Sequence, residues 1–185
     1  MILSLVRTMA MPAASRTLLL TGASGVGKST LLRRLAGALG GRRIAGFTSE
    51  EIRVGGRRQG FRVETLDGDG AVLAHTDIRS PHRVGKYGVD VEAFERLADP
   101  VLRPSDGVDV YLIDEIGPME CLSPRFVSAV RDLLASDATI VATIHRSRSG
   151  FVGWVKGRPE VELWEVTREN RERLLAAVVD WLDGE

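Results

Sequence analysis

The stretch Leu18-Leu-Leu-Thr-Gly-Ala-Ser-Gly-Val-Gly-Lys-Ser-Thr-Leu-Leu-Arg33 decides the fold of this chain. It contains Gly22-x-x-x-x-Gly27-Lys28-Ser29, the spacing of a phosphate-binding loop, between an apolar run and a helix-like segment. A strand that runs through a glycine-rich turn into a helix N-terminus aims successive backbone N–H groups at one point, and the helix dipole reinforces them. The sequence therefore predicts a polyphosphate site at this turn.

The residues of this turn have three predicted roles: catalysis, Mg²⁺ ligation and phosphate binding. Lys28 is expected to act as a catalytic residue that reaches the β- and γ-phosphates, and the Ser29 hydroxyl is expected to ligate Mg²⁺. The alternative is a coincidental glycine-rich turn, but the strand before it, the helix after it and an acidic strand end downstream all favour a phosphate site. The predicted phosphate-binding set is Gly22, Ala23, Ser24, Gly25, Val26, Gly27, Lys28, Ser29 and Thr30.

Two adjacent acids follow the apolar run Val108-Asp-Val-Tyr-Leu-Ile113. Such a run is typical of a central parallel strand that delivers acids at its carboxyl end. Asp114 is predicted to hold Mg²⁺, directly or through a water bound to the ion, and Glu115 to orient or deprotonate the attacking water. Ordinary loop-edge acids are the alternative. An acid beside the metal aspartate favours hydrolysis, because water needs a positioned base, whereas a transferase would have to seat an acceptor.

The rest of the pattern predicts a three-layer α/β fold with a mostly parallel central sheet and ligands at the carboxyl ends of its strands. Residues 44–74 alternate with period two between turn dipeptides, which predicts an antiparallel β-meander inserted after the first helix. A single domain is expected over residues 16–185, after a poorly ordered tail at 1–15. The expected strands are 16–21, 108–113, 138–144 and 161–166, the expected helices 27–39, 90–100, 123–135 and 167–182, and the expected loops 75–87 and 145–158.

Composition narrows the class of protein. Lysine plus arginine equals aspartate plus glutamate at 25 each, so no overall field attracts the chain to nucleic acid or an anionic membrane. No stretch approaches the roughly twenty apolar residues of a membrane span. Cys121 is the single cysteine, which excludes an intrachain disulfide and a four-cysteine zinc site. A reducing cytoplasm is the expected location.

Five blocks of the sequence resemble a known family. They are Thr21-Gly-Ala-Ser-Gly-Val-Gly-Lys-Ser-Thr30, Gly46-Phe-Thr-Ser-Glu-Glu-Ile-Arg53, Gly60-Phe61, Val84-Gly-Lys-Tyr-Gly-Val-Asp90 and Ile113-Asp-Glu-Ile-Gly-Pro-Met-Glu120. In this order they are similar to the P-loop nucleoside-triphosphatase family of the thermophile and cancer-related type. The last block is far more specific than the phosphate loop.

The resemblance implies a P-loop nucleoside-triphosphatase fold and Mg²⁺-dependent hydrolysis of ATP, GTP, CTP and UTP to the diphosphate and phosphate, with weak base discrimination. It assigns phosphate binding to Gly22–Thr30, and metal and water handling to Asp114 and Glu115. The family often has threonine where Ser29 stands, which preserves the hydroxyl. The tail before Arg16 has no counterpart in the family.

Residues 145–158 carry basic and aromatic side chains without an acid. Because this segment follows a central strand, Arg146 or Arg148 is a candidate to stabilise transition-state charge in cis from a lid. Lys86 is a third candidate, from the block where it and Tyr87 would close over the nucleotide. The alternative for residues 145–158 is a solvated loop with one aromatic ring tucked into the core. His145 is placed to sense the γ-phosphate, although a locally hydrogen-bonded loop histidine is the simpler interpretation.

Two further groups of polar residues lie outside the motifs. Arg53, Arg57, Arg58 and Arg62 form a basic cluster on the meander, best interpreted as a solvated hairpin edge that charge protects from pairing. Thr167 and Asn170 lie where many P-loop folds contact the base, but Thr167 also has the pattern of a helix N-cap, which is the preferred interpretation.

Two other functions remain open. A nucleotide or small-molecule kinase would share the phosphate loop, but the sequence offers no clear acceptor site beyond what the meander would host. A nucleotide-dependent switch or RNA-binding module would use the two basic segments, and the neutral overall charge disfavours it.

Overall fold

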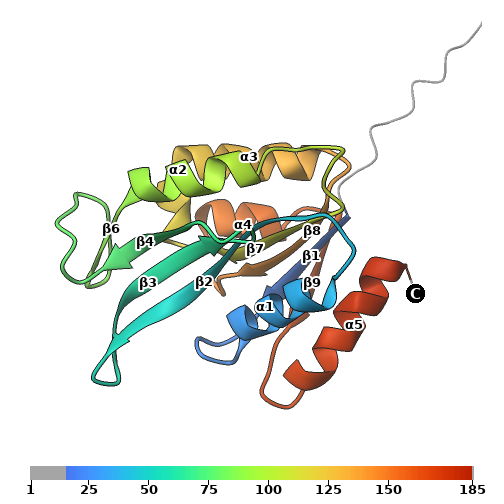
Figure 1. Cartoon of the computed structure of the whole chain (residues 1–185), viewed down its shortest axis with the longest axis horizontal. Coiled ribbons are helices and arrows are strands. Elements are labelled where there is room, and N and C mark those ends of the chain that lie inside the picture. Colours follow the sequence, from blue (N-terminus) through green and yellow to red (C-terminus); the bar gives the residue numbers. More distant parts are fainter. Residues whose placement is uncertain (1–15, 185) are drawn as a thin grey trace, which may run out of the picture.

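The computed structural model describes residues 16–184 of the 185-residue chain, so the tail predicted at 1–15 lies outside the described residues. One mixed sheet forms the centre of the molecule, with helices on both of its faces (Figure 1). Its strands are β1 (Arg16–Thr21), β2 (Ile44–Val54), β3 (Arg57–Thr65), β4 (Gly70–His75), β5 (Arg83–Val84), β6 (Tyr87–Val89), β7 (Val110–Ile116), β8 (Thr139–Ile144) and β9 (Val161–Glu165). The helices are α1 (Lys28–Ala38), α2 (Val91–Val101), α3 (Pro124–Ala135), α4 (Gly150–Lys156) and α5 (Arg171–Asp183), with a 3₁₀ turn, η1 (Glu120–Leu122).

The strand order is β5-β6-β4-β3-β2-β7-β8-β1-β9. The five strands from β2 to β9 in this order pair in parallel, and β3 to β6 extend the sheet by antiparallel pairs. This arrangement confirms the predicted fold class. The meander belongs to the same sheet, because β2 pairs with β7 over Ile44–Phe47 and then continues as the first strand of the meander.

Two hydrophobic cores lie on opposite faces of the sheet. On one face α2, α3 and α4 cover a cluster that contains Phe47, Phe94 and Phe126, and on the other α1 and α5 cover a cluster built around Leu18 and Leu20 (Figure 1). Successive leucines of β1 therefore enter different cores, and each of them is fully buried. Burial of such a side chain stabilises the fold by about 1.5–3 kcal/mol, which fixes β1 and the loop that leaves it.

Helix starts were mostly predictable from capping residues. Asp90 accepts a hydrogen bond from the Ala93 N–H at 2.9 Å, and Ser123 accepts one from the Phe126 N–H at 3.0 Å. The prediction of Thr167 as the N-cap of the last helix is wrong. The Thr167 N–H donates to the Asn170 side chain at 2.8 Å and the Asn170 N–H donates to the Thr167 hydroxyl at 3.3 Å, so a turn forms first and α5 begins at Arg171.

Two segments predicted as loops contain regular structure. Residues 83–89 form the β5–β6 hairpin, which continues the antiparallel part of the sheet. The candidate lid at 145–158 contains α4, whose Val152 and Val155 are buried in the α2–α3 core. Seven residues rich in glycine are too short for a clear helical period, so the pattern could not separate α4 from a loop.

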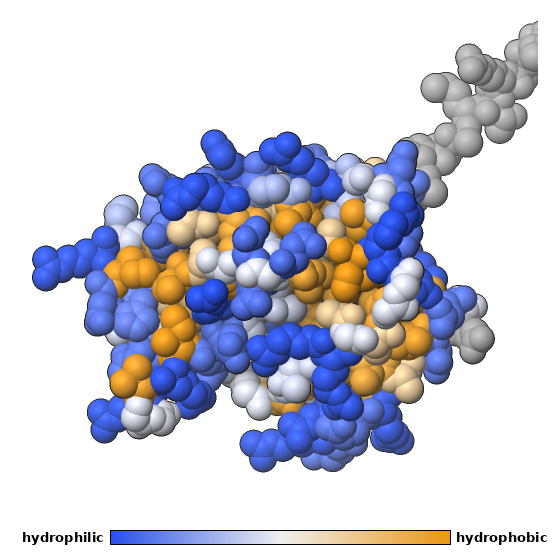
Figure 2. Space-filling view, in the orientation of Figure 1, coloured by the Kyte–Doolittle hydropathy of each residue, from blue (hydrophilic) through white to orange (hydrophobic). Residues whose placement is uncertain are grey.

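The surface agrees with the balanced composition. Figure 2 shows hydrophilic residues spread around the whole outline of this face, with apolar residues visible between them. Within residues 16–184, no helix combines the length and apolar character needed to cross a membrane.

Candidate functional site

The phosphate loop joins β1 to α1 and has the geometry that its glycines predict. Gly25 and Gly27 have φ values of +73° and +111°, in the left-handed region that favours glycine. A Cβ atom at Gly22 would lie 2.4 Å from the Val166 carbonyl oxygen, so only glycine fits there. Gly27 caps α1 without a side-chain hydrogen bond, which leaves the first N–H groups of the helix for an anion.

Lys28 reaches back over this loop. Its Nζ atom lies 3.3 Å from the Gly22 carbonyl oxygen, 3.5 Å from that of Ala23 and 3.8 Å from Glu115 Oε2. The ammonium therefore lies between the loop and the acid at the end of β7, the position that the sequence predicts for a group in contact with the terminal phosphates. Ser29 lines the same cleft.

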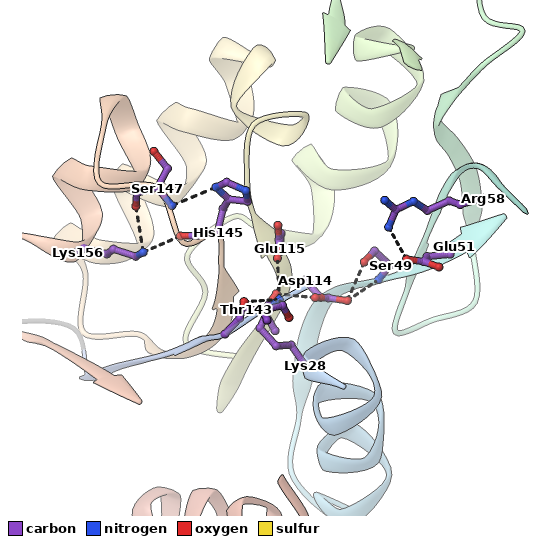
Figure 3. Close-up of polar contacts among 12 residues, drawn as sticks. Lys28, Ser49, Glu51, Arg58, Asp114, Glu115, Thr143, His145, Ser147 and Lys156 are labelled. Carbon is purple, nitrogen blue, oxygen red and sulfur yellow. Dashed lines mark hydrogen bonds and ion pairs between the residues drawn. The ribbon is translucent and has the colours of Figure 1, made fainter. Parts of the chain in front are cut away.

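Asp114 is held rigidly at the end of β7 and is buried. The Ser49 N–H and hydroxyl both donate to its Oδ2 atom, at 3.1 and 2.8 Å, and the Thr143 hydroxyl donates to Oδ1 at 2.5 Å (Figure 3). Ser49 and Thr143 come from β2 and β8, the strands on either side of β7. Sequence reasoning missed both, because their role depends on the strand order.

Glu115, the next residue, faces the cleft and is partly exposed. Burial raises the pKa of its carboxyl group, the Lys28 ammonium acts to lower it, and the Asp114 carboxylate adds to the rise. A carboxylate with a raised pKa is a stronger base than an exposed glutamate. Position and electrostatics together suit Glu115 to accept a proton from water.

Glu120 is a second acid of the cleft that sequence reasoning missed. Its side chain is buried, and among residues 16–184 no cation pairs with it. Burial, and then the charge of Glu115, raise the pKa of Glu120 to about 8, so the group is largely protonated at neutral pH. A Cβ atom at Gly117 would lie 2.9 Å from one carboxyl oxygen of each acid, so a glycine here lets the two side chains share one face of the turn.

This buried acid predicts a dependence of stability on pH. Between the ordinary pKa of an unfolded glutamate and about 8, the folded chain holds a proton that the unfolded chain has released, so the free energy of unfolding falls as the pH rises. We expect Glu120→Gln to remove a slope of up to about 1.4 kcal/mol per pH unit from this window. Urea unfolding of both proteins from pH 5 to pH 9 measures it, and parallel curves would contradict the expectation.

A cleft of about 800 Å³ joins these groups. Lys28, Ser29, Glu115, His145 and Arg146 line it, as the sequence predicts for residues near a nucleotide. Seven predicted residues are absent from its described lining: Ala23 and Val26 of the loop, Asp114, Lys86, Arg148, Thr167 and Asn170. Its walls are completed by residues of α1, β2, β3, the β5–β6 hairpin and the turn after β7, including Arg33, Glu50, Glu51, Arg53, Arg58, Phe61, Val84, Tyr87, Met119 and Glu120.

The turn after β8 is anchored by Lys156 of α4. The Lys156 ammonium donates to the carbonyl oxygens of His145 and Ser147, at 2.6 and 3.1 Å (Figure 3). The His145 Nδ1 atom accepts from the Ser147 N–H at 3.2 Å, in line with the simpler interpretation of a locally bonded histidine. Burial and the charges of Lys156 and Lys28 lower the pKa of His145, which favours a neutral imidazole.

The aromatic residues of the candidate lid lie apart from the cleft lining. Phe151 and Trp154 stack with ring centroids 5.4 Å apart, and the Arg131 guanidinium of α3 lies 4.1 Å from the Trp154 ring centroid. Arg158 lies 4.9 Å from the same centroid. Of the two arginines predicted as a charge-stabilising group, Arg146 lines the cleft and Arg148 does not.

The predicted Mg²⁺ residues fit an ion that keeps most of its water. Among residues 16–184, no group of three or more His, Cys, Asp or Glu side chains is arranged to hold a metal. Asp114 already accepts three hydrogen bonds, which leaves little of its carboxylate free for direct ligation. Mg²⁺ typically takes one or two protein ligands together with waters and phosphate oxygens, so a Ser29 hydroxyl and a water held by Asp114 form a suitable set.

Comparison with known proteins gives consistent matches over nearly the whole chain. Residues 17–179 match the family model described as NTPase. The chain is 41% identical over 166 residues to nucleoside-triphosphatase THEP1 of Thermotoga sp. (strain RQ2), covering 89% of this chain and 94% of that protein. It is also 41% identical over 181 residues to the human cancer-related nucleoside-triphosphatase, covering 89% and 95%. The crystal structure of THEP1 from Aquifex aeolicus superposes with a TM-score of 0.82 at 36% identity, covering 90% and 98%.

Proposed function

The chain belongs to the NTPase family, and on that premise we propose that it hydrolyses ATP, GTP, CTP and UTP to the diphosphate and phosphate in a Mg²⁺-dependent reaction. The observation that carries the proposal is the pairing of Lys28, on the phosphate loop, with Glu115, at the end of β7. One group suits the charge of a γ-phosphate and the other suits a water molecule beside it.

Binding rests on the loop and on Lys28. The uncapped N–H groups at the start of α1 and the loop amides hold the β-phosphate region, and the Lys28 ammonium turns from the loop carbonyls to the phosphate oxygens. These donors stabilise the charge that develops on the γ-phosphoryl group as its bond to the leaving oxygen breaks.

Glu115 positions and deprotonates the nucleophilic water. Its carboxylate orients a water in line with the leaving oxygen and takes one proton from it as the new phosphorus–oxygen bond forms, and the diphosphate leaves with the electrons of the broken bond. Glu120 holds its own proton beside Glu115 and so adds no second negative charge near the phosphates. The hydrogen bonds from Ser49 and Thr143 hold the Asp114 carboxylate in position beside Glu115.

Magnesium binding would use the Ser29 hydroxyl and a water held by Asp114. A bound Mg²⁺ would supply positive charge that offsets the charge of the triphosphate and of the leaving diphosphate.

The contacts of Thr167 and Asn170, the two residues predicted near the base, support low base selectivity. The Asn170 side chain accepts from the Thr167 N–H and donates to the Glu165 carbonyl oxygen, both at 2.8 Å, so its amide is already bonded to the backbone. Strong discrimination between bases needs polar groups that a wrong base leaves unpaired. Neither Thr167 nor Asn170 belongs to the described lining of the cleft.

Arg146 is the cation that we assign to the γ-phosphate in cis. It lines the cleft on a turn that Lys156 anchors, whereas Arg148 has the same charge on the same turn without lining the cleft. We expect Arg146→Ala to lower kcat by about 10²-fold and Arg148→Ala to leave it nearly unchanged. Steady-state kinetics of both variants tests the assignment. Equal losses of kcat in Arg146→Ala and Arg148→Ala would contradict it.

Phosphate release by the full chain tests the function itself. We expect release from all four nucleoside triphosphates with Mg²⁺, with kcat/KM values within about tenfold of one another, and none with EDTA. Release confined to one base, or undiminished by EDTA, would contradict the proposal.

A further inference from the structure

The cleft extends beyond the phosphate loop into a part that hydrolysis by water does not need. We call this part the distal arm and define it by Glu51, Arg53, Arg58, Phe61, Val84 and Tyr87, which come from β2, β3 and the β5–β6 hairpin. In Figure 3, Arg58 and Glu51 lie on one side of Asp114 and Glu115, and His145 lies on the other. The distal arm is continuous with the catalytic part of the cleft.

Two guanidinium groups are fixed in the distal arm by one carboxylate. Glu51 accepts from Arg58 Nη1 at 2.6 Å and from Arg53 Nε at 2.8 Å. Burial acts to raise the pKa of Glu51, but the hydrogen bonds and charges of Arg58 and Arg53 outweigh it and lower the pKa. Glu51 is therefore ionised at neutral pH, and two guanidinium groups against one carboxylate leave one excess positive charge in the distal arm.

Arg58 is held in place by further contacts. Its Nε donates to the Tyr87 hydroxyl at 3.2 Å, and its guanidinium lies 5.2 Å from the Phe61 ring centroid. Phe61 and Tyr87 pack edge to face at 5.4 Å, and the Lys86 ammonium donates to the Arg58 carbonyl oxygen at 3.0 Å. A cationic group fixed in this way loses little freedom when it binds an anion.

We take the nucleoside of a bound triphosphate to lie on the opposite side of the phosphate loop, where Thr167 and Asn170 precede α5. Sheet order puts β9 on one side of β1, and β2 and β3 on the other, beyond β8 and β7, and α5 follows β9 in the chain and packs against α1. Arg171 at the start of α5 flanks the loop, since a Cβ atom at Gly27 would lie 3.5 Å from its side chain. With the base on that side, the distal arm lies past the γ-phosphate and stays free.

We propose that the distal arm binds a second small molecule, an organic phosphate with a planar ring such as a nucleoside monophosphate, while the phosphate loop holds the triphosphate. Fixed guanidinium groups match phosphate oxygens, and an aromatic side chain beside a guanidinium plane suits a planar ring. A cleft of about 800 Å³ is near the upper end of the range for small-molecule sites, in agreement with two ligands. The proposal rests on the proposed function for the occupancy of the phosphate loop.

Calorimetric titration of the full chain, saturated with Mg²⁺ and β,γ-imido-ATP, tests the proposal. AMP, GMP, CMP and UMP are the probes, with inorganic phosphate and adenosine as partial ligands. We expect at least one monophosphate to bind, and both partial ligands to bind about tenfold or more weakly. Arg58→Gln should weaken the monophosphate about tenfold, whereas Arg57→Gln, an exposed neighbour outside the cleft, should not.

Phe61→Leu provides a second variant that leaves the Glu51 network intact. It removes the ring, so it should weaken the monophosphate while the binding of inorganic phosphate stays unchanged. Arg58→Gln should also leave the KM for ATP hydrolysis within about twofold of its original value, because the triphosphate binds elsewhere.

Three results would overturn the proposal: no monophosphate binds the loaded protein, Arg58→Gln and Arg57→Gln act alike, or Arg58→Gln raises the KM for ATP as much as it weakens the monophosphate. The third result would assign the distal arm to the nucleoside of ATP itself. If the proposed hydrolysis itself is wrong, the unaltered chain releases no phosphate from ATP. That result is distinct from each of the three results above.

Discussion

Glu115→Gln should abolish most nucleoside-triphosphate hydrolysis while leaving nucleotide binding intact. The amide keeps the size of the side chain and its place in the cleft, but it cannot take a proton from water. We expect kcat to fall by about 10²–10⁴-fold, the range measured for loss of a general base. The dissociation constant of β,γ-imido-ATP should rise little, or even fall, because the substitution removes a negative charge 3.8 Å from Lys28.

The matched control is Glu92→Gln, which makes the same change at an exposed residue in the first turn of α2. It should have the kinetics of the unaltered protein. If Glu115→Gln retains hydrolysis at a similar rate, Glu115 does not handle the water.

Lys28→Met should reduce both catalysis and nucleotide binding. The methionine keeps much of the apolar stem but removes the charge that faces the loop carbonyls and Glu115. Loss of one donor to the developing phosphate charge corresponds to about 10²–10³-fold in kcat, and loss of the ground-state contact adds a rise in KM. The two variants are therefore separable, since only Lys28→Met should weaken β,γ-imido-ATP strongly.

Lys86→Met is the control for the charge change. Lys86 donates to a backbone carbonyl of Arg58 and lies outside the described cleft lining, so its replacement should leave kcat for ATP hydrolysis unchanged. Equal losses in the two lysine variants would contradict the assignment of Lys28.

Much of the fold could be predicted because local signals carry it. The phosphate loop, the apolar run before Asp114 and the caps Asp90 and Ser123 each depend on residues close together in sequence, and the structure has them in the expected elements. Thr167 was misassigned because it and Asn170 compete for the same turn, and only the fold decides which of them caps α5.

The site was predictable where chemistry follows a motif, and not where it depends on strand order. Lys28, Ser29 and Glu115 line one cleft, as their spacing predicts. Ser49 and Thr143 carry no local signal, because they meet Asp114 only through the pairing of β2, β7 and β8. Glu120 belongs to a recognised block, but its proton-holding state arises from burial, which spacing does not reveal.

The roles of the basic residues on β2 and β3 also depend on strand pairing, which the sequence does not reveal. Sequence alone treated Arg53 and Arg58 as a solvated hairpin edge, whereas the structure links both to Glu51 on the wall of the cleft. Arg57, one residue before Arg58, is exposed and lies outside the cleft lining. Alternation along β3 decides which arginine faces the site, and the register of that strand depends on its pairing with β2.

Hydrolysis in water enriched with ¹⁸O tests most directly whether this chain directs water at the γ-phosphorus. The full chain, with Mg²⁺ and each of the four nucleoside triphosphates, should release phosphate that carries one ¹⁸O atom from the solvent, and the diphosphate should carry none. Release of pyrophosphate, ¹⁸O in the diphosphate, or no phosphate from any of the four nucleotides would contradict the account.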